Sequence, residues 1–407
     1  MGTVEWMVVV LVVGGRLVLP LFIPYFPVPA LVACMILDSA DQSIFQQFPR
    51  IPLEGYQSYD KALDVYYLSI AYLSTLRNWT NQIAFRMAQF LFYYRMVGVV
   101  SFELTQWRPL LFIFPNTFEY FWLFVEAVRL GWNTSRMGKW TVILAAAGIW
   151  IFIKLPQEWW IHIAELDMTD FIKETLFGVT ADTGWGDAIA NRPWVLVAMI
   201  AFFAVIGAIV YLIVRYKCPR FDHGPHLAAD PLPPELHGAE PFRLVKASER
   251  IFGWALREKI ALTAILSVIF ASMLSGGNAH PVRIAVGAAL FTIINAAVSH
   301  WMATRGRSWK RTAGELVTML VVNLVIVLVL EFLDRTLGMR DARVPFGETL
   351  FFSYLLTLVI VLYDRYRVVY KARRLHKHPE QQTAAPEGGP GPAAQGQAGP
   401  EASPGPA

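Results

Sequence analysis

The stretch Leu37-Asp38-Ser39-Ala40-Asp41-Gln42 carries two aspartates inside an apolar run that extends from about residue 29 to residue 46. A charge at the centre of a membrane costs roughly 2.5–3.5 kcal/mol, so it persists only where a partner or a hydrated cavity receives it. On a helix, Asp38, Asp41 and Gln42 share one face because they are three and four residues apart. We therefore expect a helix bundle with a polar interior near this stretch.

The composition is typical of a membrane protein. Of the 407 residues, 55% are hydrophobic and only 16% are charged, whereas soluble domains carry about 25% charged residues. Lys and Arg gather at the ends of apolar runs. This pattern is typical of membrane topology and not of nucleic-acid binding. The expected partner is therefore the lipid bilayer. The two cysteines, Cys34 and Cys218, form no disulfide framework or CxxC metal motif, and we expect neither a metal nor a cofactor.

The apolar runs predict an all-α fold, a multi-pass transmembrane bundle of about eleven spans, each near the ~20 residues that cross a bilayer. Basic residues after the last run place the C-terminus in the cytoplasm and the protein in the plasma membrane; residues 1–46 form either two spans or a re-entrant pair. The predicted parts are an N-terminal bundle (1–214), a cytoplasmic linker (215–249), a four-helix transmembrane region (250–374) and a disordered Pro/Gly/Ala-rich tail (375–407).

Charged residues concentrate in the first five segments. Two neighbouring carboxylates resist ionising together, which makes one of them a plausible proton carrier. Alternatively, Asp38 and Asp41 form a purely structural ion pair with Arg86 or Arg95. Arg95 is the better candidate, because the aromatic residues beside it and Gly98 allow close packing. The candidate ion or substrate site comprises Asp38, Asp41, Gln42, Arg86, Arg95, Glu103 and Glu119.

Other charges have simpler interpretations. Asp60 and Asp64 open a helix and are expected at the outer membrane surface, where the helix dipole favours acids. In the last four segments, charges such as Glu258, Lys259 and Asp364 lie near segment ends, where snorkelling to water explains them.

Two prolines mark breaks in the predicted helices. Pro115 predicts a kink within the segment 109–130. After Pro156, a helix would place Glu158, His162 and Glu165 on one face. We interpret this as an interfacial helix on the outer surface; an acid–base pair or a metal site at that face is the alternative.

Four strings resemble an uncharacterised family of bacterial (actinobacterial) polytopic integral membrane proteins: LDSADQ (37–42), YQSYDKALDVYYLSIAYLSTLRNW (56–79), FPNTFEYF (114–121) and KLPQEWWIHIAELD (154–167). The resemblance covers roughly residues 1–375. It implies a membrane location and says nothing about chemistry.

Three functions fit these patterns. The first is a proton- or cation-coupled transporter of a small ion or solute that uses the intramembrane acid pair. The second is a membrane enzyme acting on a lipid or lipid-linked substrate at the outer face. The third is a non-catalytic accessory membrane protein whose charges hold helices together. Neutralising Asp38 would abolish transport only in the first case.

Overall fold

The computed structural model describes residues 3–46, 56–233, 236, 253–274, 281–305, 317–325, 328 and 346–377. Within these residues every regular element is helical and none is a strand, so the all-α prediction is confirmed. The predicted tail lies outside the described residues from 378 onward. The main elements are α1 (Thr3–Val18), α2 (Pro27–Gln46), α3 (Tyr56–Asn78), α4 (Gln82–Thr105), α5 (Pro109–Ile113), α6 (Thr117–Arg129), α7 (Lys139–Gly148), α8 (Leu155–His162), α9 (Met168–Phe171), α10 (Trp185–Asn191), α11 (Pro193–Lys217), α13 (Trp254–Leu274), α14 (Pro281–Thr304) and α16 (Phe346–Lys377).

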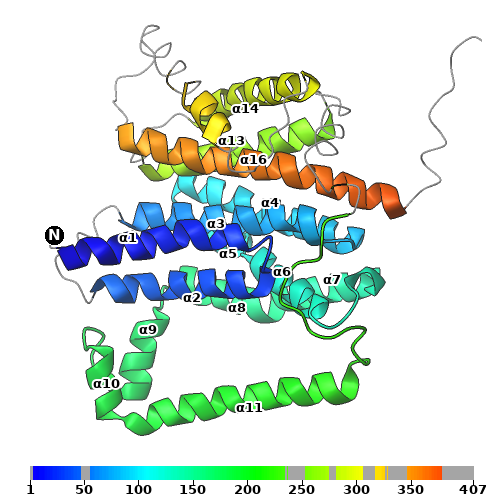
Figure 1. Ribbon diagram of the computed structural model, residues 1–407. Helices are drawn as coiled ribbons and strands as arrows, with labels where there is room; N and C mark the ends of the chain where they lie inside the picture. The colour runs from blue at the N-terminus through cyan, green and yellow to red at the C-terminus, as the bar shows by residue number, and fades with distance from the viewer. Residues whose placement is uncertain are drawn as a thin grey trace, which may run out of the picture.

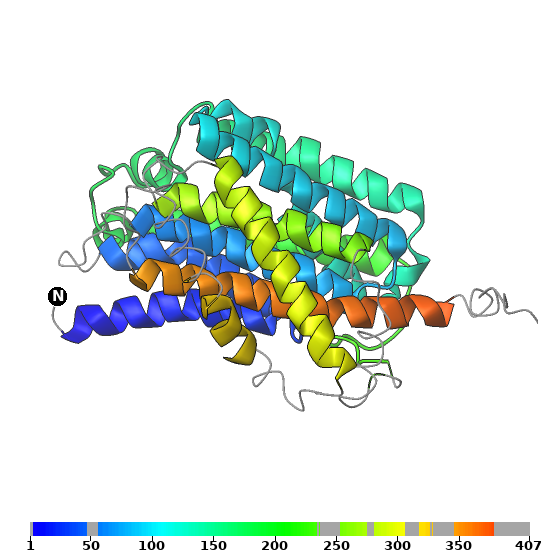
Figure 2. The same cartoon turned by 90° about the horizontal axis from the view of Figure 1, so that it is seen from above.

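Helix α3 is the centre of the bundle. Almost all of its residues from Ala62 to Asn78 are buried, and α1, α2, α4, α13 and α16 pack around it. Figure 1 shows these helices lying side by side in stacked layers, and Figure 2 shows α14 crossing them obliquely. Polar groups on α3 hold two neighbours directly: the Tyr66 hydroxyl donates to the Leu17 carbonyl at 3.1 Å, and the Trp122 indole donates to the Ala71 carbonyl at 3.0 Å.

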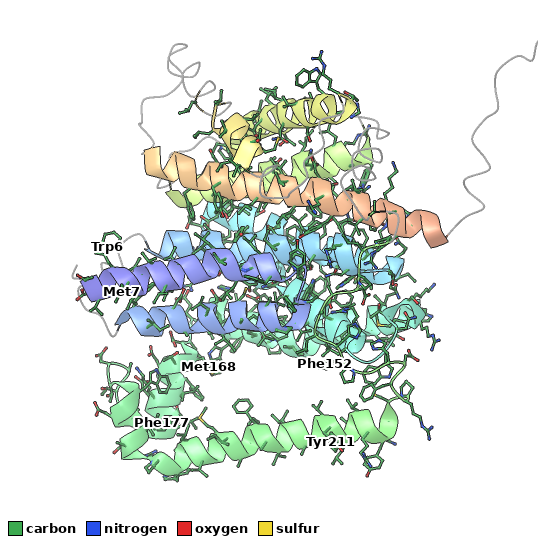
Figure 3. The ribbon with its side chains drawn as sticks, viewed as in Figure 1. Trp6, Met7, Phe152, Met168, Phe177 and Tyr211 are labelled. Atoms are coloured by element: carbon green, nitrogen blue, oxygen red, sulfur yellow. The ribbon has the colours of Figure 1, made fainter. Side chains whose placement is uncertain are left out.

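Several helices are long and apolar enough to cross a membrane. Among the described residues there are four such stretches: Thr3–Phe22, Lys139–His162, Pro193–Lys217 and Ile284–Trp301. Large apolar side chains on these stretches point outward, as Trp6, Met7, Phe152 and Tyr211 do in Figure 3. Helix α11 stands apart from the bundle and leaves nearly all of its apolar side chains exposed (Figure 1). A bilayer would cover this surface; the count of eleven spans remains a prediction.

The described part of the predicted linker is docked on one end of the bundle. Asp222 accepts from Arg136 at 2.9 Å, and the Ala229 amide donates to the Tyr25 carbonyl at 2.7 Å. Arg373, close to the end of α16, donates to the Pro231 carbonyl at 3.1 Å. We call this the linker end; α1 and α3 both begin at the opposite, N-terminal end (Figure 1).

The C-terminal helices join the N-terminal bundle through buried polar groups. Glu258, only 5% exposed, accepts hydrogen bonds from Tyr72, Gln89 (2.7 Å) and Tyr363 (2.9 Å). Lys259, also 5% exposed, forms an ion pair with Asp364 at 2.8 Å. Snorkelling is therefore the wrong explanation for these charges: α13 turns them toward α3 and α16, where they find partners inside the protein.

Candidate functional site

The most highly charged group in the bundle consists of one arginine and four aspartates. Arg16 on α1 forms ion pairs with Asp38 and Asp41 on α2 and with Asp60 and Asp64 on α3. We call these five residues the acid cluster. Nη2 of Arg16 also lies 3.5 Å from the Asp60 backbone carbonyl. Three helices therefore meet at one guanidinium.

Close helix packing brings Arg16 to this place. A Cβ at Gly15 would lie 2.9 Å from Leu37 Cδ2, so glycine lets α1 approach α2 this closely without displacing the leucine side chain. The next residue, Arg16, then projects between α2 and α3. At 1.5 Å per residue, Asp64 lies roughly 12 Å from the Tyr56 end of α3 and roughly 21 Å from its other end. The acid cluster therefore sits well inside the length of the bundle.

Negative charge exceeds positive charge in the acid cluster. One guanidinium faces four carboxylates, which leaves three more acids than Arg16 can neutralise. The side chains of Arg16 and Asp41 are 3% and 4% exposed, whereas those of Asp38, Asp60 and Asp64 are 30–38% exposed. An excess of carboxylates around one guanidinium attracts protons or cations.

Three of the acids are close enough together to share a cation. One carboxylate oxygen from each of Asp38, Asp60 and Asp64 lies within 4.8 Å of the others. Oxygen-only ligands suit hard cations. In this structure the Arg16 guanidinium contacts all three residues and supplies the positive charge that such an ion would bring.

The arginines expected beside the acid pair lie elsewhere. Arg86 is exposed. Arg95 donates to the Phe114 carbonyl at 3.0 Å and approaches the Leu111 carbonyl at 3.5 Å. Arg95 is therefore the wrong partner for Asp38 and Asp41: it caps the end of α5, while Arg16 reaches the acids. Asp60 and Asp64, predicted to be solvated residues at a helix start, are partly exposed members of the acid cluster.

Glu103 and Gln42 are the two other predicted site residues of the first segments. Glu103 has a side chain 7% exposed and lies 3.7 Å from the Lys61 ammonium. Gln42 belongs to α2, but its side chain lies outside the described part of the structure.

A second polar group forms at the predicted Pro115 break. The segment divides into α5 and α6, with Phe114, Pro115 and Asn116 between them. At the break, the last carbonyls of α5 and the first amides of α6 have no partners within their helices. Arg95 caps the carbonyl end of α5. The Asn116 amide donates to Glu158 Oε1 at 3.0 Å, and the Asn116 side chain donates to Glu119 Oε2 at 3.0 Å. One asparagine thus holds both carboxylates.

Helix α8 contributes the rest of this group. His162 Nε2 lies 3.0 Å from Glu158 Oε2, one helical turn away. Lys154, 3% exposed, donates to Gln157 at 3.0 Å and lies 4.3 Å from the centre of the Tyr120 ring. A π-helical turn, Ile149–Lys154, places Lys154 just before Pro156; such turns are rare and frequent at functional sites. We call Asn116, Glu119, Lys154, Glu158 and His162 the Asn116 site.

Tyr67 joins α3 to the Asn116 site. Its hydroxyl donates to Glu119 Oε1. On α3, Tyr67 lies about one turn beyond Asp64. Glu119, predicted to belong with Asp38, instead lies in the Asn116 site.

The predicted face of Glu158, His162 and Glu165 is only partly preserved. Glu158 and His162 are in contact, but α8 ends at His162 and Glu165 adopts φ +53°. Glu165 pairs at 3.0 Å with Arg108 in an exposed position. Because the helix stops before Glu165, this residue does not join the buried pair.

Comparisons with protein families, curated proteins and solved structures found no match to this chain. The resemblance to an uncharacterised bacterial membrane family remains a prediction.

Sequence reasoning did not assign Arg16 to the site. One signal was present: Arg16 follows Gly14 and Gly15 inside an apolar segment, and paired glycines permit close helix contact. Only the packing of α1 against α2 and α3 decides which cation serves the aspartates.

Proposed function

We propose that this protein is a proton- or cation-coupled transporter of the plasma membrane, with the acid cluster as its coupling site. The observation that carries the proposal is the imbalance of one guanidinium against four carboxylates inside the bundle. Buried carboxylates without balancing charge take up protons or cations. Release of those ions on the other side of the membrane would drive the transport of a solute.

Arg16 acts in this proposal as a tethered cation. Arg16 shares its guanidinium among four acids. When a proton or metal cation neutralises one of these acids, the electrostatic attraction between Arg16 and that acid weakens. The partial exposure of Asp38, Asp60 and Asp64 gives ions a way to reach the cluster from one side. Arg16 would then move closer to Asp41, the most deeply buried acid.

The broken helix α5–α6 also supports a transporter. Interrupted helices with charged side chains at their free ends are a recurring feature of transporter sites. Here Arg95 caps the end of α5, and Glu158 and Glu119 lie at the start of α6.

The proposed topology has about eleven spans, with the linker end in the cytoplasm. The basic residues Arg129, Arg136 and Arg373 all lie at the linker end, as the positive-inside rule requires of a cytoplasmic face. The acidic stretch 156–192 and the beginning of α1 then face outward.

Charge movement in proteoliposomes on a solid-supported membrane tests the proposal. Steps of proton, Na⁺ or K⁺ concentration should produce a current in the wild type, and Asp38→Asn or Asp64→Asn should abolish it without loss of folded protein. Glu174→Gln changes an exposed acid of the stretch 156–192 and serves as the matched control. Currents unchanged in both aspartate variants would exclude the acid cluster as the coupling site.

The accessory role makes a different prediction. If the acids only hold helices together, Asp41→Asn and Arg16→Gln would each lower the yield of folded protein, and the double variant would recover it with no associated current.

A further inference from the structure

We propose that the apolar surface between α11 and the span Lys139–His162 binds an anionic phospholipid, whose headgroup is held by basic residues at the linker end. This lipid site lies outside the acid cluster and the Asn116 site, and it is independent of transport. The four basic residues that would hold the headgroup, which we call the basic rim, are Lys139, Arg215, Lys217 and Arg220.

The middle of α11 is exposed on every side. Each residue from Ile200 to Ile213, about four helical turns, is exposed, and none of the most apolar 18-residue window of α11 is buried. The other three candidate spans bury 17–22% of the corresponding window. The side of α11 that looks toward the bundle is therefore as open as its outer side, and acyl chains are the covering that a membrane offers to both.

Contacts at its two ends fix α11 in this position. At the N-terminal end, Val195 packs with Phe177 in a small apolar cluster. At the linker end, the Trp132 indole donates to the Pro219 carbonyl at 3.0 Å, two residues after α11 stops. Figure 1 shows α11 joined to the rest of the protein at these two ends. The space between α11 and the bundle is thus part of the fold.

The span Lys139–His162 supplies the opposite apolar surface. Ile151, Phe152 and Ile153 are 53%, 79% and 44% exposed, and Figure 3 shows Phe152 on the side of the bundle that looks toward α11. This span begins at the linker end, where α11 stops, so the two run antiparallel. Acyl chains lying between them would have their headgroup beside the first turn of α7 and the last turn of α11.

The basic rim lies at that level and has charge to spare. All four of its residues are exposed, and none of them forms an ion pair with a described residue. Asp222, the acid nearest to them in the sequence, pairs with Arg136 at 2.9 Å. Basic residues between membrane helices at the bilayer surface recognise anionic headgroups, so the rim selects for a negatively charged lipid.

Aromatic side chains place the rim at the membrane interface. The Lys139 ammonium lies 5.4 Å from the centre of the Trp140 ring, and the Arg215 guanidinium lies 5.8 Å from the centre of the Tyr216 ring. Trp and Tyr are enriched at the level of the headgroups. The cations that sit beside these rings are therefore within the layer that contains lipid phosphates.

A second copy of the chain is the competing occupant of this surface. Most homo-oligomers are closed and symmetric, and two copies inserted in the same direction would bring two basic rims together at one membrane surface. Like charges repel at such distances, whereas an anionic headgroup neutralises them. Charge complementarity therefore favours the lipid.

Native mass spectrometry of the full-length protein in detergent tests the site by counting bound lipids. We expect the first phosphatidylglycerol to bind at least about ten-fold more tightly than phosphatidylcholine with the same acyl chains, because each nearby cation strengthens the binding of an anionic headgroup. This preference should disappear in the triple variant Lys139→Gln, Arg215→Gln and Lys217→Gln. It should persist in a matched control that removes three exposed arginines elsewhere, Arg86→Gln, Arg257→Gln and Arg305→Gln.

A photo-reactive side chain shows where the lipid lies. Phe152→p-benzoylphenylalanine, irradiated after extraction into detergent, should add the mass of one phosphatidylglycerol, and the triple variant should lose this adduct. Equal binding of the two lipids by the wild type, or an unchanged preference in the triple variant, would overturn the lipid site. A cross-link between two copies without lipid would assign the surface to a dimer and overturn it as well. Failure of the acid cluster would appear separately, in the transport currents.

Discussion

Replacing Arg16 by methionine keeps an unbranched, flexible side chain but removes a guanidinium that contacts four aspartates. Removing one partner of a buried ion pair costs about 3–5 kcal/mol because the other charge stays buried. Asp41 is 4% exposed, but the other three acids are 30–38% exposed and are therefore partly screened. We expect a loss near the lower end of this range, about 3 kcal/mol in the free energy of unfolding.

Unfolding in mixed micelles of increasing denaturing detergent, followed by tryptophan fluorescence, measures this loss. Arg86→Met is the matched control, because Arg86 is exposed, and it should leave the unfolding midpoint unchanged. Adding Asp41→Asn to Arg16→Met should recover part of the lost stability, since one buried negative charge disappears.

The stability of the Arg16→Met variant should change with pH in a defined direction. Without Arg16, the folded state keeps protons on its crowded carboxylates, whereas the unfolded state releases them into water. The folded state then binds more protons, so its stability rises as the pH falls. If Arg16→Met lowered the free energy of unfolding by less than about 1 kcal/mol at neutral pH, the range of an exposed ion pair, Arg16 would not be the central counter-ion.

Three further predictions concern the surrounding structure. Glu258→Ala removes the acceptor that Tyr72, Gln89 and Tyr363 share; we expect a loss of about 1–3 kcal/mol in unfolding free energy, and no loss would contradict a role in joining the two halves. Asn81→Ala removes the cap that accepts from the first amides of α4, which should cost about 1–2 kcal/mol in the same assay. Arg129→Gln removes the contact with the Ala228 carbonyl at 3.1 Å, so hydrogen exchange across residues 219–230 should accelerate; unchanged protection would show that other contacts hold the linker.

Local spacing in the sequence was enough to foresee several features. The common face of Asp38 and Asp41, the break at Pro115 and the contact between Glu158 and His162 all follow from helical periodicity or from proline. Each depends on residues within a few positions of one another, and the structure has them as expected.

Partners from distant parts of the chain could not be foreseen in the same way. Arg16, Arg86 and Arg95 were all available cations, and the choice among them depends on which helices pack together. Glu258 was interpreted as a snorkelling charge because it lies near a segment end, but in the structure the Tyr72 and Tyr363 hydroxyls donate to it and Arg367 lies 3.6 Å away. Counting charges along a sequence does not detect an acid held by hydroxyl groups.

Infrared difference spectroscopy of the full-length protein in lipid tests the central claim most directly. Protonated carboxyl groups absorb separately from carboxylates, so a change from neutral to mildly acidic pH reveals the acids that take up protons. We predict a carboxyl band from a shielded environment that Asp64→Asn or Asp38→Asn removes or shifts and that Glu174→Gln leaves unchanged. A band that neither aspartate variant alters would contradict ion uptake by the acid cluster.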